Sequence, residues 1–371
     1  MPSSTATAAP PVGTAQGPPG ARAVWAALGA AGDLEDLYEP SRRDPRYGLD
    51  PHALEALLSK ADAVHGTGVT LSVCVQAAGA LPLLHDVRGN ETAAALGARA
   101  RKGRAVLAVA ATDSETAGSD LANLETRVDE DAGGLLLQGG KRWIVNALHA
   151  DHALVLARHR DGGHFTSFTL LLVPLDLPGV RREATGTRMF DGSGLGSLYF
   201  DRVRLPTTHR LGGTGRGLAA FSRRISTERL ASGLWANALA RRTLTETRRL
   251  LRSRTVGGAP QEQHPVVRHQ LAEALTGQQQ LQALCERCCA PAGPATPPVS
   301  ALTAVLKATG ARTLEQVLDT CARFSGAEAF LRDGLQEARA EVAMFGTAGG
   351  TTHLLYDLIA DHADALLGPR P

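Results

Sequence analysis

The stretch Gly134–Ala147 reads GLLLQGGKRWIVNA, and it decides the fold class of the chain. Glycines enclose a short apolar run at its start, which is the usual pattern of a β-strand bounded by turns. Further short apolar runs follow, separated by Gly, Pro and Asp, at Ala153–Ala157, Ser167–Val173 and Ser197–Phe200. Short strands separated by turns indicate a β-barrel or β-sandwich in the middle of the chain.

Helical patterns flank this β region. Pro51 followed by leucines at helical spacing predicts a helix start, and the apolar stretch Val69–Leu84 predicts a buried helix. After Gly217 the helical period returns, and one long helix is expected at each of Ile225–Arg254, Pro265–Ala290, Ser300–Phe324 and Glu328–Phe345. The predicted fold class is α+β, with a disordered tail (1–20), an N-terminal helical domain (21–108), a middle β domain (109–212) and a C-terminal four-helix bundle (213–371).

Composition narrows the classes of function. The 371 residues carry 39 Lys+Arg against 37 Asp+Glu, and this near balance excludes the basic surface of a general nucleic-acid binder. No run approaches the roughly 18 apolar residues of a membrane span, and Met1–Gly20 lacks a secretory signal pattern, so we expect a soluble, cytoplasmic protein. Five cysteines are too few for a disulfide framework; Cys285, Cys288 and Cys289 are expected to pack in a helix rather than bind metal.

Four segments carry a resemblance to a known family. They are Thr112-Asp113 with Gly118-Ser119-Asp120; Gly140–Ala147 with Ala150-Asp151 and Leu154–Arg158; Phe200–Pro206; and Glu228-Arg229 with Arg254, Gly258 and Gly349-Gly350-Thr351. Together, in this order and at compatible spacing, they resemble the acyl-CoA dehydrogenase superfamily of flavoproteins. The resemblance runs from about Ala21 to Leu367. It implies the helical, β and helical-bundle domains of that family, and an FAD cofactor.

The resemblance also implies roles for individual residues. A flavin ring needs a flat, apolar slot that is poor in water, and the strand pair around Trp143 is suited to line one. The residues implied for FAD are Ala111, Thr112, Trp143, Ile144, Val145, Arg254, Val256, His264, Arg323, Gly326, Thr351 and His353, and those implied for the substrate are Ser119, Arg229, Gly349 and Gly350. Read without the family, Trp143 is a buried strand aromatic and Arg254 complements a helix dipole. In the family the arginine at the position of Arg254 reaches the FAD of a neighbouring subunit, which implies a homodimer or homotetramer.

The catalytic base is expected at Glu228. In many family members a Glu stands directly before the C-terminal Gly-Thr, but this chain has Gly349 there, which cannot act as a base. In a branch that includes isovaleryl-CoA dehydrogenase, the base precedes an Arg on a bundle helix, as Glu228 precedes Arg229. Apolar neighbours would raise the pKa of Glu228 towards neutral pH. The alternative is an ordinary Glu–Arg pair on a solvated helix face.

Several positions depart from the family pattern near the cofactor. Val145 replaces a Thr whose hydroxyl normally hydrogen-bonds the flavin, and Pro265 and Arg323 each replace a Gln. Gly257 replaces an aromatic residue, and Ala327 replaces a glycine. These departures predict weaker FAD binding or a changed reaction.

The predicted function is FAD-dependent oxidation of an acyl thioester, by removal of an α-proton and transfer of a hydride to the flavin. The chain resembles short biosynthetic enzymes of actinobacterial polyketide pathways, which act on acyl-CoA or on acyl groups held by an acyl carrier protein, including hydroxymalonyl-type units. One predicted helix carries a row of arginines, namely Arg241, Arg242, Arg248, Arg249 and Arg252. These arginines could bind an acidic carrier protein, or they could simply form a solvent-exposed helix face. The electron acceptor, electron-transfer flavoprotein or oxygen, stays open. The alternatives are a flavin N-hydroxylase or monooxygenase, and a non-catalytic relative.

Overall fold

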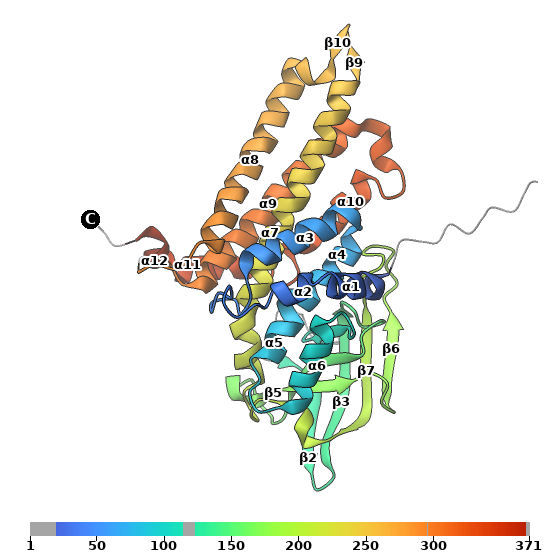
Figure 1. The fold of residues 1–371 in the computed structure, drawn as a ribbon, viewed down its shortest axis with the longest axis vertical. Coiled ribbons are helices and arrows are strands. Elements are labelled where there is room, and N and C mark those ends of the chain that lie inside the picture. Colours follow the sequence, from blue (N-terminus) through green and yellow to red (C-terminus); the bar gives the residue numbers. More distant parts are fainter. Residues whose placement is uncertain (1–19, 114–122, 295, 369–371) are drawn as a thin grey trace, which may run out of the picture.

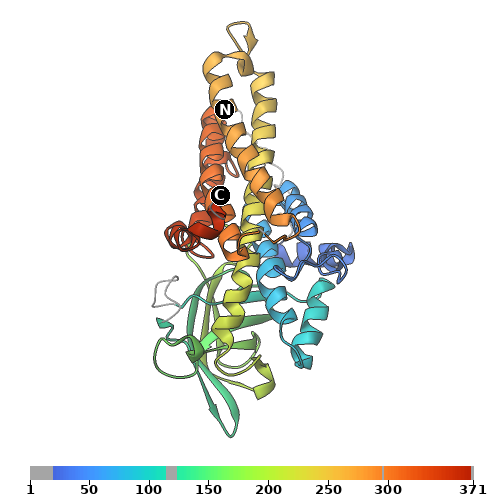
Figure 2. The same cartoon turned by 90° about the vertical axis from the view of Figure 1, so that its left-hand side faces the viewer.

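The computed structural model describes residues 20–113, 123–294 and 296–368. The predicted disordered tail and the predicted substrate residue Ser119 lie outside the described residues. A mixed sheet forms one end of the molecule, a helical bundle forms the other, and the N-terminal helices pack between and beside them (Figures 1 and 2).

The N-terminal domain is helical, as predicted. Its helices are α1 (Ala21–Ala30), α2 (Asp33–Asp36), α3 (Pro51–Val64), α4 (Thr67–Cys74), α5 (Leu81–His85) and α6 (Glu91–Arg101), with a π-helical segment, η1 (Val75–Ala80), joining α4 to α5. The helix start at Pro51 is confirmed: the Asp50 carboxylate caps α3 by accepting hydrogen bonds from the N–H groups of His52 and Ala53.

The stretch Thr67–His85 corrects one expectation. It has a mean hydropathy of 1.5 and is long and apolar enough to cross a membrane by length and composition, so the statement that no run approaches that length is wrong. Small residues such as Ala77, Ala78 and Gly79 sit among its larger apolar side chains, so close packing is possible all round. In the structure 83% of this stretch is buried against the rest of the chain, as in the core helix of a globular domain.

The middle region forms one mixed sheet. Its strands are β1 (Leu107–Ala110), β2 (Arg127–Asp131), β3 (Gly134–Ile144), β4 (His152–Arg158), β5 (Phe168–Pro174), β6 (Val180–Ala184), β7 (Gly196–Leu205) and β8 (Arg210–Leu211). The order across the sheet is β6-β7-β3-β2-β4-β5-β8, and β1 lies parallel beside β4. The predicted strands around Gly134, Ala153, Ser167 and Ser197 are all present.

The C-terminal region is a bundle of long helices. These are α7 (Gly217–Ser253), α8 (Pro265–Cys289) and α9 (Val299–Ser325), and a hairpin of β9 (Thr255–Val256) and β10 (Ala259–Pro260) joins α7 to α8 at the tip farthest from the sheet (Figure 1). The shorter helices α10 (Leu335–Val342), α11 (Thr352–Asp361) and α12 (Ala363–Leu367) pack beside α9 or follow it.

The single long helix predicted over Glu328–Phe345 is wrong. The chain instead forms two 3₁₀ turns, η6 (Gly326–Phe330) and η7 (Ala343–Gly346), on either side of α10. Asp333 adopts a positive φ of 59°, and a Cβ on Gly334 would lie 2.6 Å from the carbonyl oxygens of Ala329 and Leu331. This tight turn breaks the helix, because positive φ is incompatible with helical backbone.

Candidate active site

Glu228 lies on α7 beneath a tight turn of the C-terminal segment. Gly349 in this turn has a φ of 66°, and a Cβ placed on it would lie 2.8 Å from Oε1 of Glu228. The same Cβ would lie 3.5 Å from Cε of Lys307. The structure therefore brings the predicted base and the predicted substrate residue Gly349 together, and the absence of a side chain at Gly349 leaves the carboxylate room.

Lys307 was missed by the sequence reasoning. It projects from α9, is 2% exposed, and its ammonium donates hydrogen bonds to the carbonyl oxygens of Phe345 (2.9 Å) and Gly350 (3.0 Å). Burial lowers the pKa of Lys307 to about 8, although the charge of Glu228 opposes that shift. The available signal was its rarity: the chain has only four lysines, and Lys307 stands in an apolar helix.

The charges around Glu228 oppose the effect of burial. Burial raises the pKa of the Glu228 carboxyl group, and the positive charges of Lys307 and Arg229 act in the other direction. Burial also lowers the pKa of Arg229, whose Nε is buried without a hydrogen-bond partner among the described residues. The thiol of Cys74, from α4, faces the same carboxylate, and burial raises its pKa. Glu228 and Arg229 are both half-buried, which argues against the alternative of a fully solvated Glu–Arg pair.

A second cluster surrounds Trp143 at the end of β3. The pairing of β3 with β7 shifts register between Lys141 and Ile144, which is the mark of a β-bulge. At this bulge Trp143 takes a φ of 57° and is 56% exposed, so its reading as a buried strand aromatic is wrong. A bulge and a strained backbone that turn a large aromatic ring outwards are typical of a ligand-binding edge of a sheet.

A buried ion pair fixes the backbone beside Trp143. The Lys141 ammonium, which is fully buried, binds the Asp113 carboxylate and donates a 3.0 Å hydrogen bond to the carbonyl oxygen of Ala111. Asp113 also accepts hydrogen bonds from the N–H and the hydroxyl group of Thr126. The N–H of Arg142 donates to the carbonyl oxygen of Thr112.

These contacts hold the predicted cofactor residues Ala111 and Thr112 beside Trp143. Of the other two predicted residues on this strand end, Ile144 is buried and Val145 packs partly against the core.

A third cluster of predicted cofactor residues lies at the far end of the bundle: Arg254, Val256, His264, Arg323 and Gly326. Arg254 directly follows α7 as its C-cap residue, and its guanidinium donates to the carbonyl oxygen of Phe324 and pairs with Glu328 at 2.8 Å. Arg254 therefore caps the C-terminus of α9 and also stands at the C-terminus of α7. Gly326 is the C-cap of α9 with a φ of 64°, and Arg323 pairs with Asp319.

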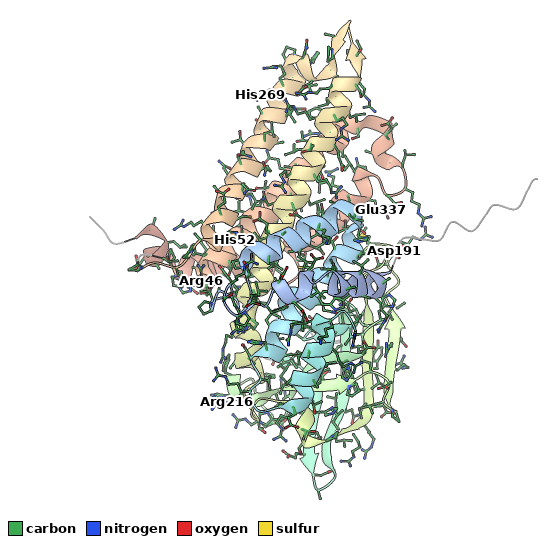
Figure 3. All side chains as sticks on the ribbon, viewed as in Figure 1. Arg46, His52, Asp191, Arg216, His269 and Glu337 are labelled. Atoms are coloured by element: carbon green, nitrogen blue, oxygen red, sulfur yellow. The ribbon has the colours of Figure 1, made fainter. Side chains whose placement is uncertain are left out.

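The third cluster cannot join Glu228 within one chain. The 26 residues of α7 that separate Glu228 from Arg254 span about 39 Å at the helical rise. Figure 3 shows the two ends of this long helix region, with Arg216, just before α7, near the sheet and His269 of α8 near the opposite tip. Of the last two predicted cofactor residues, Thr351 caps α11 near Gly349 and His353 follows it in the first turn.

One group of possible metal ligands occurs among the described residues. Ligand atoms of His52, Glu55 and Cys289 lie within 4.8 Å of one another, where α3 meets the end of α8 (His52 is labelled in Figure 3). Burial raises the pKa of Cys289 to about 12, so the thiol keeps its proton and would bind a metal only on losing it.

Comparison with known proteins identifies the family. The middle domain of the acyl-CoA dehydrogenases matches residues 108–203, and their C-terminal domain matches residues 215–363. The chain belongs to the acyl-CoA dehydrogenase family, as its sequence motifs predicted.

Individual relatives are distant. Acyl-CoA dehydrogenase AFT10-1 of Alternaria alternata is 27% identical over 65% of this chain and 58% of its own length. Acyl-[acyl-carrier-protein] dehydrogenase MbtN of Mycolicibacterium paratuberculosis is 26% identical over 71% of this chain and 67% of its own. The match thus spans little more than half of the first curated relative. The FAD complex of PigA has a TM-score of 0.82 at 19% identity, covering 92% of this chain and 88% of that one, and has the same fold.

Proposed function

We propose that this protein is an FAD-dependent dehydrogenase of an acyl thioester, with Glu228 as its catalytic base. One observation carries the proposal: the half-buried Glu228 carboxylate lies against the Gly349 turn, with the cations Lys307 and Arg229 near it. A carboxylate whose pKa is raised by burial, with cations beside it to favour its charged form, is suited to remove a weakly acidic α-proton.

The chain's own groups divide the work of the reaction. Glu228 takes the α-proton of the acyl group, and the backbone N–H of Gly349 polarises the thioester carbonyl, a role that needs no side chain. The β-hydrogen would leave as hydride to a two-electron acceptor, which FAD would supply when bound. The product is the α,β-unsaturated thioester, and the proton stays on Glu228 until solvent removes it.

The residues at the bulge fit a flavin. Trp143 offers an exposed aromatic face, and the Lys141–Asp113 pair fixes the Ala111-Thr112 backbone next to it. Because Arg254 and its neighbours lie about 39 Å from Glu228 along α7, they would serve the cofactor of a second copy. This separation supports an assembly of at least two subunits, a homodimer or a homotetramer.

The proposal also concerns the group that carries the acyl chain, either an acyl carrier protein or coenzyme A. A carrier-protein thioester from a biosynthetic pathway is favoured by two features: the similarity to MbtN, whose name states that substrate class, and the arginines of α7. Arg241 and Arg249 line the groove between α3 and α7, where an acidic partner could bind, whereas Arg248 and Arg252 both pair with Glu262. An acyl-CoA is the other candidate substrate.

A second candidate function is oxygen-dependent flavin chemistry, such as N-hydroxylation. It is favoured by Val145, which offers no hydroxyl group at the position where the family has Thr. The chain also shares its fold with PigA, but a likeness at 19% identity carries no reaction to this chain.

The test is anaerobic reduction of the FAD-loaded protein by a panel of acyl-CoA and acyl-carrier-protein thioesters. We expect the flavin absorbance to bleach with at least one thioester and to stay unchanged in Glu228→Gln. Reduction by NADH, with oxygen consumption in the presence of an amine, would support N-hydroxylation instead. Protein that takes up no added FAD would refute both proposals and leave a non-catalytic relative.

A further inference from the structure

We propose that Lys307 is a positioning residue that fixes the Gly349 turn beside Glu228 and keeps the Glu228 carboxylate charged. The inference rests on the proposed function, because it concerns the base of that reaction. Lys307 lies on α9, whereas Glu228 lies on α7 and the turn above it belongs to the segment before α11. Three separate parts of the chain therefore come together around Gly349.

The first part of the argument is geometric. The ammonium of Lys307 donates one hydrogen bond to the carbonyl oxygen of Phe345 and one to that of Gly350, on either side of the turn that contains Gly349. The Phe345 end is itself held, because its ring packs at 4.8 Å from the ring of buried Trp235 on α7. Lys307 thus ties the turn to the bundle, and with it the Gly349 backbone directly above Glu228.

The second part is electrostatic. The charged or titratable groups that face Glu228 come from each element around it: Lys307 from α9, Arg229 from α7 and Cys74 from α4. Burial favours a neutral carboxyl group at Glu228, and a neutral carboxyl group cannot accept the substrate proton. Of the two cations, Lys307 has the larger effect in lowering the pKa of Glu228.

The site suits a lysine. A compact ammonium donates in several directions from one point, so it can hold two carbonyl oxygens and still leave a full charge near the carboxylate. Its stem also reaches the glycine, since Cε lies 3.5 Å from where a Gly349 Cβ would be. A neutral side chain of the same length would fill the space but provide neither the charge nor the two donors.

The proposal is tested by titrating the Glu228 carboxyl group directly. Infrared difference spectra of the full-length protein, recorded against pH, give the pKa of the carboxyl band that disappears in Glu228→Gln. We expect Lys307→Met to raise that pKa by about one to two units, as follows from removing a charge several ångströms away in a partly buried site. Lys307→Arg should retain most of the original value. Lys102→Met, an exposed lysine at the end of α6, is the matched control and should change nothing.

The pH profile of kcat/KM gives the second readout. Its acidic limb should move to higher pH in Lys307→Met by the same amount as the infrared pKa. An unchanged pKa and limb in Lys307→Met, with folding intact by circular dichroism, would overturn the proposal, because a purely structural lysine lowers the rate without moving the limb. If Lys307→Met does not fold, an unshifted pKa in Lys307→Gln would overturn it equally.

The two proposals fail in different ways. If Glu228→Gln still oxidises the thioester at the wild-type rate, the proposed base is wrong whatever Lys307 does. If Glu228→Gln is inactive but Lys307→Met leaves the pKa of the Glu228 carboxyl band unchanged, only the inference about Lys307 is wrong. If the band shifts in a protein that oxidises no thioester, the inference about Lys307 stands and the proposed function fails.

Discussion

The carboxylate can be moved from Glu228 to position 349. A Cβ on Gly349 would lie 2.8 Å from Oε1 of Glu228, and a glutamate's own carboxyl oxygens lie roughly 3 Å from its Cβ by standard bond lengths. A glutamate at 349 can therefore place an oxygen where Glu228 now has one, provided that Glu228 is shortened. The double variant Glu228→Ala, Gly349→Glu should thus restore a base that Glu228→Ala lacks.

The expected magnitudes follow from the role of the carboxylate. Glu228→Ala should lower kcat/KM by about 10²- to 10⁴-fold, the usual contribution of a general base. The double variant should recover about 10- to 100-fold of that loss. The φ of 66° at Gly349 is left-handed, so the new side chain costs about 1 to 2 kcal/mol of stability. Gly349→Glu alone should lose activity, because two carboxylates would compete for one position.

The assay is anaerobic bleaching of bound FAD under single-turnover conditions, with the thioester that reduces the wild type fastest. The matched control is Glu228→Ala with Gly349→Gln, which has the same shape without the charge and should recover nothing. The reasoning would be refuted if the double variant were folded, bound FAD normally and reacted no faster than Glu228→Ala. It would also be refuted if Glu228→Ala alone kept more than about a tenth of wild-type activity.

Three further predictions concern the cofactor edge, the buried ion pair and pH. Trp143→Ala should weaken FAD binding about 3- to 10-fold in a fluorescence titration. Phe165→Ala removes a similarly exposed ring and should leave FAD binding unchanged. Equal effects of the two variants would argue against a role for Trp143. Lys141→Met should lower the free energy of unfolding in urea by about 3 to 5 kcal/mol, because it leaves the Asp113 carboxylate buried without its cationic partner. A loss below about 1 kcal/mol would contradict this prediction. Burial raises the pKa of Cys321 from 9.0 to about 11, so the folded chain keeps a proton that the unfolded chain loses. The stability that this thiol contributes is present below pH 9 and is lost as pH rises to 11, at up to about 1.4 kcal/mol per pH unit. Urea unfolding under reducing conditions should therefore show a shallower loss of stability with pH in Cys321→Ala than in the wild type. An identical slope would contradict this prediction.

The sequence was sufficient for the order of most elements, and it yielded Glu228 as the proposed base. Turn glycines with short apolar runs mark strands, and leucines at helical spacing mark helices, because both patterns reflect local backbone preferences. The broken helix around Asp333 was missed, although Asp333-Gly334 is a dipeptide that marks turns and Asp tolerates positive φ. The helix Thr67–His85 reads as membrane-like in composition, and only its burial in the fold places it in a core.

The candidate site likewise separates what the sequence determined from what the tertiary structure determined. The sequence by itself determined which residues could do the chemistry: Glu228 before Arg229, a glycine at 349, and Trp143 in a strand motif. Only the tertiary structure decided that Lys307 from α9 lies beside the same turn as Glu228 and that Trp143 faces outwards at a bulge. The physical reason is that charge coupling and ligand contact depend on distance and burial, and these arise only when segments far apart in the sequence pack together.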